Sequence, residues 1–428
     1  MDSTRLTACL ACGSGKLVPF LNLGVQALAN DYQTIADANF SMFPLKLNYC
    51  PVCFHAQQSI AVDPALLYTD YPYASGISAT LRKYFANFVM QVEQDGPAGR
   101  LNVLEIASND GSLLREFQQC GHIVTGVDPA RNLAPLNIPT IPSYWNANAL
   151  VALDAIGRTR FDVIVAMNVL GHVQDPLTFL TLAKSVLASG GRIYIQTSQA
   201  DMLLNAEWDT CYHEHLSFFT VKSFITLATR AGLLVQNISV VPIHGNSYLF
   251  ELTTDAGRIP TGDVATRLHF EQAHAFYQPG TYEAFQFHVQ TACDSARTSI
   301  DHFRRSGWRV VGYGAAAKFV TFLNTAQLKL DIVVDDAPLK QGKYMPGVDA
   351  LVMPLNDLSS FVDPAKKILW IIGAWNFAPE IIDRINNKRS RYPSAFMTLM
   401  PLVKLWPQSK QIESPAIPAS DVERRTDL

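Results

Sequence analysis

Apolar and polar positions follow one another in blocks over residues 101–128, which read LNVLEIASNDGSLLREFQQCGHIVTGVD. Residues 101–106 are mostly apolar, as is typical of a parallel strand that is covered on both faces. A polar turn with Gly111 follows, and apolar residues then recur at helical spacing over 113–117. A second apolar run covers 123–127. The segment therefore predicts a strand, a turn, a helix and a strand, with room for a small molecule at the turn.

Carboxylates occur at both strand ends of this segment. Asp128 follows the second strand, where a carboxylate can accept hydrogen bonds from a ribose diol. The first turn lacks the GxGxxG spacing that binds a pyrophosphate, and its anionic side chains disfavour a phosphate. They suit S-adenosylmethionine (SAM), whose amino group and sulfonium are cationic. An ordinary turn between a strand and a helix, with polar side chains that bind no ligand, also explains the segment. The residues expected around this cofactor are Glu105, Ala107, Ser108, Asn109, Asp110, Asp128 and Asn168.

The same succession continues along the chain and indicates an open, doubly wound α/β sheet. Residues 161–167 read as a buried strand, and a helix over 177–187 and a strand over 192–197 follow. His172 lies in the loop after the first of these strands, where ligands bind in such sheets. It either contacts a substrate or merely caps backbone groups.

A second, smaller α/β unit is expected in the carboxyl-terminal part. Its expected elements are a helix over 281–305, strands over 308–311, 332–336 and 368–373, and a helix over 378–387. Lys318 follows the small residues of GYGAAA at a helix N-terminus, where it can hold a phosphate. The alternative interpretation is that Lys318 is a solvated surface lysine that binds no ligand.

Composition narrows the class of protein. The 428 residues suffice for two or three domains, and 48% hydrophobic with 17% charged residues is ordinary for a globular protein. A net charge of −3 argues against a nucleic-acid partner. No apolar run reaches the roughly 18 residues of a membrane span, and the first residues lack a signal-peptide layout. We therefore expect a cytoplasmic protein without a membrane partner.

Four of the seven cysteines form two CxxC motifs, Cys9 with Cys12 and Cys50 with Cys53, separated by 37 residues. Four thiolates in this arrangement predict a tetrahedral zinc site, with redox-active pairs or disulfides as alternatives. Because a full set of four thiolates leaves no open coordination position, we expect the metal to be structural.

Two further segments concentrate reactive side chains. Residues 62–78 carry Tyr68, Tyr71 and Tyr73, which either fill domain interfaces or together form a lid. Residues 209–219 are the densest polar group of the chain, with the motif Tyr212-His213-Glu214-His215. A second metal site and an inert hydrogen-bonded turn are the alternatives to a catalytic role for this motif.

Five motifs together resemble the zinc-containing sugar C-methyltransferases, which methylate a carbon of nucleotide-linked deoxy-keto-sugars. These motifs are the two CxxC pairs, EIASNDGSLL, YHEHLSFF, HGNS and DDAPLKQGKYMPG. EIASNDG is also similar to the first motif of class I methyltransferases, with Ala107 where glycine is usual, and Asn246 replaces the second glycine of HGGS. The resemblance implies a class I (Rossmann-like) methyltransferase core with a zinc-binding domain before it and a Rossmann-like α/β domain after it. That last domain would help hold the diphosphate of the substrate.

The resemblance also implies roles for single residues. His215 would be the general base, with Tyr212, Glu214 and His172 beside the reacting sugar, and Tyr73 is the best match for a tyrosine of the amino-terminal loop. Such groups suit the chemistry, because methylating a carbon beside a ketone requires an enolate and donors that stabilise its oxygen. The expected substrate contacts are His213, Asn246, Lys318, Lys340 and Lys343.

We therefore expect a SAM-dependent C-methyltransferase, monomeric or homodimeric, that acts on a dTDP-linked 4-keto-deoxysugar in natural product biosynthesis. The alternatives are another enolisable carbonyl substrate, a zinc-containing nucleic-acid methyltransferase and a non-catalytic nucleotide-sugar binding protein. The expected divisions are a zinc-binding domain over 1–62, a Tyr-rich loop and helix over 63–98, a SAM-binding domain over 99–255, a carboxyl-terminal domain over 256–408 and a flexible tail over 409–428.

Overall fold

The computed structural model describes residues 2–35, 40–68, 75–77, 79–96, 99–133, 137–198, 201–243, 245–363, 365–387 and 393–407. Tyr71, Tyr73 and the predicted tail over 409–428 lie outside the described residues. The chain divides into two compact units. The first contains Met1–Phe20, Leu47–Asp201 and Glu214–Thr281, and the second contains Leu21–Lys46, Met202–His213 and Tyr282–Leu428.

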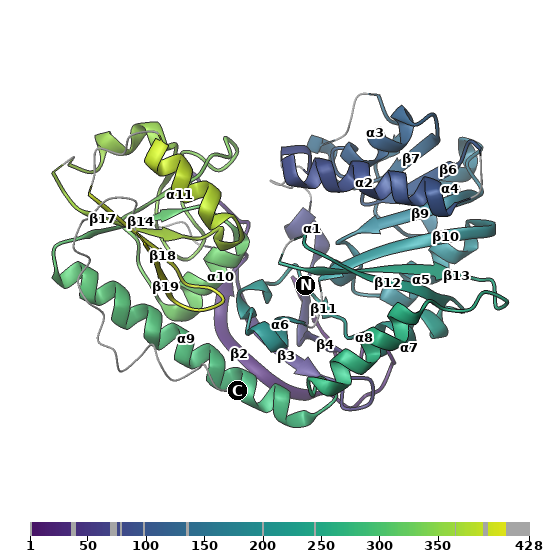
Figure 1. The fold of residues 1–428 in the computed structure, drawn as a ribbon, viewed down its shortest axis with the longest axis horizontal. Coiled ribbons are helices and arrows are strands. Elements are labelled where there is room, and N and C mark those ends of the chain that lie inside the picture. The colour runs from purple at the N-terminus through teal and green to yellow at the C-terminus, as the bar shows by residue number, and fades with distance from the viewer. Residues whose placement is uncertain are drawn as a thin grey trace. The chain divides into compact units, whose positions relative to one another are not determined.

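The first unit is built on a seven-stranded sheet of order β12-β13-β10-β9-β6-β7-β8 (Figure 1). Its strands are β6 (Asn102–Ile106), β7 (Ile123–Val127), β8 (Thr140–Ile141), β9 (Phe161–Met167), β10 (Leu187–Ser198), β12 (Leu234–Val241) and β13 (Ser247–Thr253). All neighbours are parallel except β13, which runs antiparallel to both β10 and β12. The first five strands thus have the order 3-2-1-4-5 of a doubly wound fold, which confirms the predicted α/β class.

Helices cover both faces of this sheet. They are α2 (Ala79–Asp95), α3 (Ser112–Gln119), α4 (Ala147–Ala155), α5 (Pro176–Ser185), α7 (Val221–Arg230) and α8 (Gly262–Ala273). In β6, Val103 packs with α2 and α3 on one face, whereas Leu104 and Ile106 pack with α5 and α7 on the other (Figure 1). The apolar run that begins at Leu101 is therefore buried on both sides, as expected for a central parallel strand.

The carboxyl end of α5 differs slightly from the prediction. The helix ends at Ser185, two residues earlier than expected, and β10 begins at Leu187 rather than Arg192. The pairing of β10 with β9 shifts register between Leu187 and Arg192, and Gly190 has a φ of 74°. A bulge at a left-handed glycine thus lets this segment join the strand.

The remaining elements of the first unit belong to its amino-terminal part. They are β1 (Ser3–Arg5), β4 (Ala56–Gln58), β5 (Ile60–Val62), α1 (Pro64–Tyr68) and the short 3-10 helix η1 (Ser75–Ile77). Three further short elements lie later in the chain, namely the 3-10 helices η2 (Arg131–Leu133) and η3 (Leu170–His172) and the strand β11 (Ser217–Phe218). A four-stranded sheet has the order β11-β4-β3-β2, where β2 (Val18–Ala27) and β3 (Met42–Tyr49) each have most of their residues in the second unit. Ser217 of β11 pairs with Gln57 of β4, so the strand after the YHEH motif extends the sheet of the amino-terminal domain.

The second unit contains a six-stranded sheet of order β16-β15-β14-β17-β18-β19, parallel except for β19. Its strands are β14 (Arg309–Tyr313), β15 (Ile332–Val334), β16 (Val352–Met353), β17 (Ile368–Ile372), β18 (Ser394–Thr398) and β19 (Lys404–Trp406). Its helices are α6 (Asp201–Asn205, whose first residue belongs to the first unit), α9 (Pro279–Arg305), α10 (Ala317–Ala326), α11 (Ala378–Asn387) and the 3-10 helices η4 (Trp208–Thr210), η5 (Leu355–Ser360) and η6 (Trp375–Phe377). This is the predicted Rossmann-like unit.

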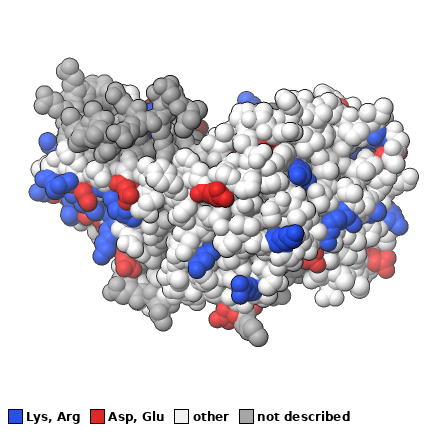
Figure 2. Space-filling view, turned by 90° about the horizontal axis from the view of Figure 1, so that it is seen from below, with Lys and Arg blue, Asp and Glu red and all other residues white. Residues whose placement is uncertain are grey.

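Among the described residues, no helix combines the length and the apolar character that a membrane span requires. On the face drawn in Figure 2, lysine and arginine side chains lie close to one another in places, with acidic side chains beside some of them.

Candidate active site

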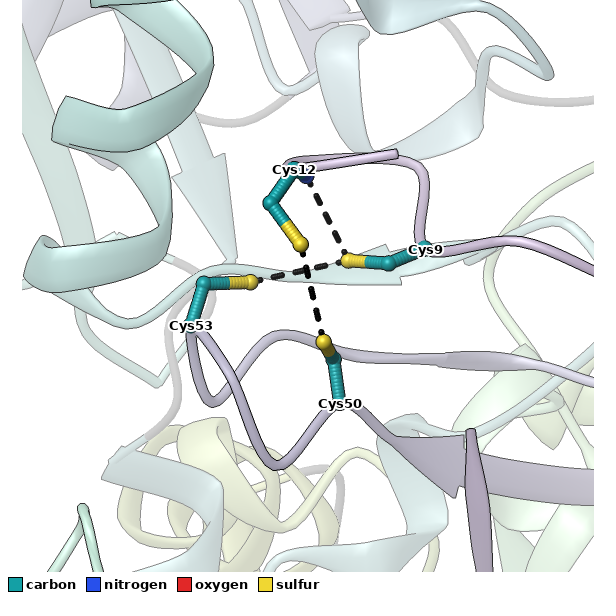
Figure 3. Close-up of side chains that lie close together, drawn as sticks. All are labelled: Cys9, Cys12, Cys50 and Cys53. Atoms are coloured by element: carbon teal, nitrogen blue, oxygen red, sulfur yellow. Dashed lines mark hydrogen bonds between the residues drawn. The ribbon is translucent and has the colours of Figure 1, made fainter. Parts of the chain in front are cut away.

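The four cysteines of the CxxC motifs lie together in the first unit and point toward one centre (Figure 3). The Sγ atoms of Cys9 and Cys53 are 3.5 Å apart, those of Cys12 and Cys50 are 3.6 Å apart, and all four lie within 4.8 Å of one another. Tetrahedral Zn–S bonds of about 2.3 Å place the sulfurs about 3.8 Å apart, so the spacing fits zinc. None of the four is in a disulfide. The predicted structural zinc site is confirmed.

The backbone of both knuckles supports this metal geometry. Gly13 and Phe54, each directly after the second cysteine of its pair, have left-handed φ values of 78° and 60°. The amide of Gly13 donates to the carbonyl of Cys9, and the amide of Phe54 donates to the carbonyl of Cys50. Each knuckle is therefore a tight turn that points two sulfurs inward.

The turn after β6 has an unusual backbone. Ala107, Asn109 and Gly111 have φ values of 60°, 52° and 71°. The amide of Asn109 donates to Oδ2 of Asp128 at 2.7 Å, and the amide of Ala130 donates to Oδ1 at 2.7 Å. A carboxylate has about four acceptor positions, so Asp128 can still accept from a ribose. Ala107 thus adopts a left-handed conformation, which glycine would adopt at less cost.

Burial dominates the electrostatics of this turn. The pKa of Glu105 is raised well above its ordinary value by burial and by the neighbouring charges of Asp128 and Asp110. Burial also raises the pKa of Asp128, although the amides of Ala130 and Asn109 oppose the effect. A cation bound here would stabilise both carboxylates, because an opposite charge favours the ionised form.

Several buried polar atoms without a hydrogen-bond partner among the described residues lie near the carboxyl ends of β6, β9 and β10 or at the start of α3. They are Glu105 Oε2, Ser108 Oγ, Ser112 Oγ, Asn168 Oδ1 and Thr197 Oγ1. Buried polar groups are normally paired, so this set indicates a polar ligand. The carboxylate and carbonyl acceptors among them suit the amino group and ribose of SAM, so the residues fit the predicted cofactor.

We call the turn after β6, residues 107–111, the cofactor turn. Two of its side chains also bind the short helix η1. The amide of Ser75 donates to Oδ1 of Asn109 at 2.9 Å, and the amide of Gly76 donates to Oδ2 of Asp110 at 2.7 Å. Sequence reasoning predicted cofactor contacts for Asn109 and Asp110. In the structure these two side chains connect the cofactor turn to the segment that precedes α2.

The imidazoles of His172 and His215 lie next to each other in the first unit. Their ring centres are 4.9 Å apart with the planes at 68°. The hydroxyl of Tyr68 lies 3.2 Å from Nδ1 of His172 and donates to the carbonyl of Glu214 at 3.3 Å. The structure thus brings together two predicted site residues and Tyr68. From the sequence, Tyr68 and Tyr73 belonged to one loop and Tyr73 was favoured for the site. No sequence signal pointed to Tyr68, whose position at the end of α1 is known only from the structure.

Backbone contacts fix the position of His215 from its carboxyl side. The amide of Leu216 donates to the carbonyl of Gly171 at 2.8 Å, and its carbonyl accepts from the amide of Gln58 at 2.9 Å. The imidazole of His55 lies 3.1 Å from Oγ of Ser217. Because His55 follows Cys53 closely in the chain, the zinc knuckle and His215 are linked through β4 and β11.

The YHEH motif is divided between the two units after His213. Glu214 is buried in the first unit, and His213 is buried in the second. Nε2 of His213 lies 3.3 Å from the carbonyl of Phe43, and burial lowers the pKa of this histidine to about 4. His213 is thus a neutral side chain engaged with the protein. Tyr212 is half-buried in the second unit.

The other expected substrate contacts lie in different places. Asn246 is exposed in the first unit with a φ of 82°, a left-handed conformation that asparagine tolerates better than most residues. In the second unit, Nζ of Lys340 donates to the carbonyl of Ala315 at 2.6 Å, and Lys318 lies in the first turn of α10. Lys343 is half-buried in the turn that leads to β16.

Sequence comparison identifies three families that match consecutive parts of the chain. The family described as "Putative zinc binding domain" matches residues 9–68, "Methyltransferase domain" matches 77–238, and "C-methyltransferase C-terminal domain" matches 242–401. C-methyltransferase NovU of Streptomyces niveus is 27% identical over 390 residues, which cover 88% of this chain and 91% of that protein. Ubiquinone biosynthesis O-methyltransferase of Cereibacter sphaeroides is 31% identical over 168 residues, which cover 35% of this chain and 66% of that protein.

Two solved structures overlap with part of the chain. Magnesium protoporphyrin IX methyltransferase of Synechocystis PCC 6803, with bound SAM, has a TM-score of 0.31 and 13% identity, covering 41% of this chain and 79% of that one. The CurJ carbon methyltransferase has a TM-score of 0.31 and 15% identity, covering 41% of this chain and 55% of that one.

Proposed function

We propose that this chain, a SAM-dependent C-methyltransferase with a structural zinc site, deprotonates a carbon next to a ketone and methylates the resulting enolate. The observation that carries the proposal is the adjacency of His172 and His215, with the hydroxyl of Tyr68 against His172, in the unit that also contains the cofactor turn. Oxygen or nitrogen methylation needs less acid-base chemistry than these side chains provide.

The proposed catalytic residues act in two parts of the reaction, the removal of the proton from carbon and the stabilisation of the enolate oxygen. His215 takes the proton from carbon, because an imidazole titrates near neutral pH and can accept it. A positioned base of this kind contributes roughly 10² to 10⁴ in rate. The hydroxyl group of Tyr68 is the proposed donor that stabilises the enolate oxygen, and Tyr212 is a further proposed donor that is supported only by the resemblance of its motif. Each such donor is worth roughly 10² or more in kcat.

The cofactor, when bound, supplies an electrophilic methyl group on a sulfonium. Glu105 and Asp128 would hold it by accepting hydrogen bonds from its polar groups, and their carboxylates would stabilise its positive charge. Asn168, which has a left-handed φ of 55° at the carboxyl end of β9, presents its buried side-chain oxygen at the same edge of the sheet. This methyl group would be transferred to the enolate carbon, with the new C–C bond formed as the S–CH3 bond breaks.

We propose a nucleotide-linked 4-keto-deoxysugar as the substrate. The support is the resemblance of YHEHLSFF, HGNS and the segment around Lys340 and Lys343 to sugar C-methyltransferases. A diphosphate requires cations, and Lys340 and Lys343 are the proposed neighbours, with Asn246 and His213 as further proposed contacts.

The experiment uses methyl-labelled SAM and a panel of keto-sugar nucleotides in deuterated water. We expect label transfer to carbon, and exchange of the proton next to the ketone when SAM is omitted. His215→Ala should abolish both, whereas His269→Ala, which removes an exposed imidazole from α8, should leave both unchanged. Label transfer to a keto compound that is not a sugar would overturn the substrate class, and the absence of both exchange and transfer would overturn the proposed function.

A further inference from the structure

The carboxyl-terminal sheet has the strand order in which Rossmann domains bind a dinucleotide. Numbered from β14 along the chain, its order is 3-2-1-4-5-6, and β14 and β17 are the adjacent strands at which the direction of winding reverses. Ligands of such sheets bind in the crevice at the carboxyl ends of these two strands. Here Lys318 lies in the first turn of α10 after β14, and Trp375 begins η6 after β17.

The residues of this crevice are bound to a segment of the chain itself. Trp208 of η4 is fully buried and stacks on Phe322 of α10 with ring centres 4.8 Å apart. Asp209, 1% exposed, accepts a hydrogen bond at Oδ2 from the indole N–H of Trp375 at 2.8 Å. The ammonium of Lys318 lies 5.2 Å from the centre of the Trp375 ring.

The charges of this cluster complement one another. Burial raises the pKa of Asp209, and the positive charge of Lys318 is the largest effect that opposes it. Asp209 and Lys318 therefore have complementary charges, and Lys318 lies in the first turn of α10, at the helix N-terminus where a dinucleotide-binding domain holds a phosphate.

Only short backbone links separate this cluster from Tyr212. The amide of Cys211 donates to the carbonyl of Trp208 at 3.0 Å, and the amide of Tyr212 donates to the carbonyl of Thr210 at 3.1 Å. On the other side of Tyr212, His213 is buried against the carbonyl of Phe43. Tyr212 is thus carried by a short turn that is held at both ends within the second unit.

We propose that Asp209, Lys318 and Trp375 are positioning residues, which use the crevice of the carboxyl-terminal sheet to hold the turn that carries Tyr212. In this role the crevice binds an internal segment where a dinucleotide-binding domain would bind its cofactor. The effect on catalysis rests on the proposed function, because Tyr212 is a proposed oxyanion donor. The effect on the stability of the turn does not depend on the proposed function.

Hydrogen exchange measured by mass spectrometry tests the effect on the turn without any substrate. Lys318→Met removes the charge and keeps the length of the side chain. We expect the amides of residues 210–213 to exchange roughly 10-fold faster or more in this variant, since a locally destabilised segment opens more often. Lys318→Arg should restore slow exchange. Lys367→Met is the matched control, because Lys367 lies 5.6 Å from the ring centre of Trp308 in the same unit and should not affect the turn.

A milder variant protects the test against loss of folding. Trp375→Phe removes the indole donor to Asp209 and keeps an aromatic ring under Lys318, so it should accelerate the same amides by a smaller factor. Unchanged exchange of residues 210–213 in both Lys318→Met and Trp375→Phe would overturn the proposal.

Steady-state kinetics test the effect on catalysis. We expect Lys318→Met to lower kcat by roughly 10-fold to 100-fold, the cost of a small misplacement of a catalytic group, with KM for SAM unchanged. In a Tyr212→Phe background the same substitution should have no further effect on kcat, whereas a merely structural role would lower it again. A higher KM for the sugar nucleotide, with kcat and exchange unchanged, would identify Lys318 as a phosphate ligand and overturn the proposal. If no keto-sugar is methylated, the proposed function fails. The hydrogen-exchange measurement still tests whether Asp209, Lys318 and Trp375 hold the turn that carries Tyr212.

Discussion

Glu271 of α8 offers a prediction about pH and stability that can be calculated from the structure. The residue is fully buried in the first unit. Its carboxylate accepts hydrogen bonds from the amide of Val221 at 3.0 and 2.9 Å, from the hydroxyl of Tyr248 at 2.8 Å and from the hydroxyl of Tyr277 at 2.5 Å. Arg267 donates to the same Tyr248 hydroxyl at 2.6 Å and pairs with Asp201. This network joins α8 to α7 and β13.

Burial raises the pKa of Glu271 from 4.5 to about 7, and the hydrogen bonds from Tyr277, Val221 and Tyr248 only partly oppose it. The folded protein therefore binds this proton more tightly than the unfolded chain does. Its stabilising contribution is fully present below pH 4.5 and is lost as the pH rises through about 7. At about 1.4 kcal/mol for each pH unit of difference, the loss amounts to about 3 kcal/mol.

Glu271→Gln is expected to remove this dependence, because an amide resembles the protonated carboxyl and does not titrate. We would measure the opening free energy of peptides from α7 and β13 by hydrogen exchange between pH 5 and pH 8, corrected for intrinsic exchange rates. The wild-type protein should lose about 2 kcal/mol or more over this interval relative to the variant. Asp263→Asn changes an exposed carboxylate on the same helix and should keep the wild-type slope. Parallel curves for the wild-type protein and Glu271→Gln would refute the reasoning.

Three further predictions concern the site. Tyr68→Phe should lower kcat by roughly 10-fold or more through loss of a hydroxyl against His172, with KM for SAM unchanged in steady-state kinetics. Removing zinc with a chelator should release one ion per chain and abolish activity, because β4 of the zinc-binding part pairs with the strand that follows His215. The sheet of the second unit should stay folded. Activity that survives complete release of zinc would contradict this link. Ala107→Gly should raise the free energy of unfolding by about 1 kcal/mol in urea titrations, because it relieves a left-handed alanine.

Features that depend on neighbours in the chain could be predicted from sequence. The apolar runs of β6, β7 and β9 are buried on both faces, so short runs identified them as central parallel strands. The doubled CxxC motif predicted its metal, because four thiolates have few other uses in such spacing. The long helix expected over 281–305 is α9, Pro279–Arg305.

Features that depend on distant parts of the chain could not be predicted in this way. Tyr68 and His172 are 104 residues apart, and only packing of α1 against the loop after β9 brings their side chains together. The same holds for Glu271, whose partners come from α7, β13 and the segment after α8, and for Asp209, whose partner Trp375 lies 166 residues away.

The sequence by itself thus determined the α/β class, the zinc ligands and the type of cofactor, because local periodicity and ligand spacing encode them. Only the tertiary structure decided that Tyr68 meets His172, that the YHEH motif is divided between two units, and that the charge of Lys318 acts on the buried carboxyl group of Asp209. The physical reason is that a side chain's chemistry is set by burial and by the charges around it, and both come from residues far away in the sequence.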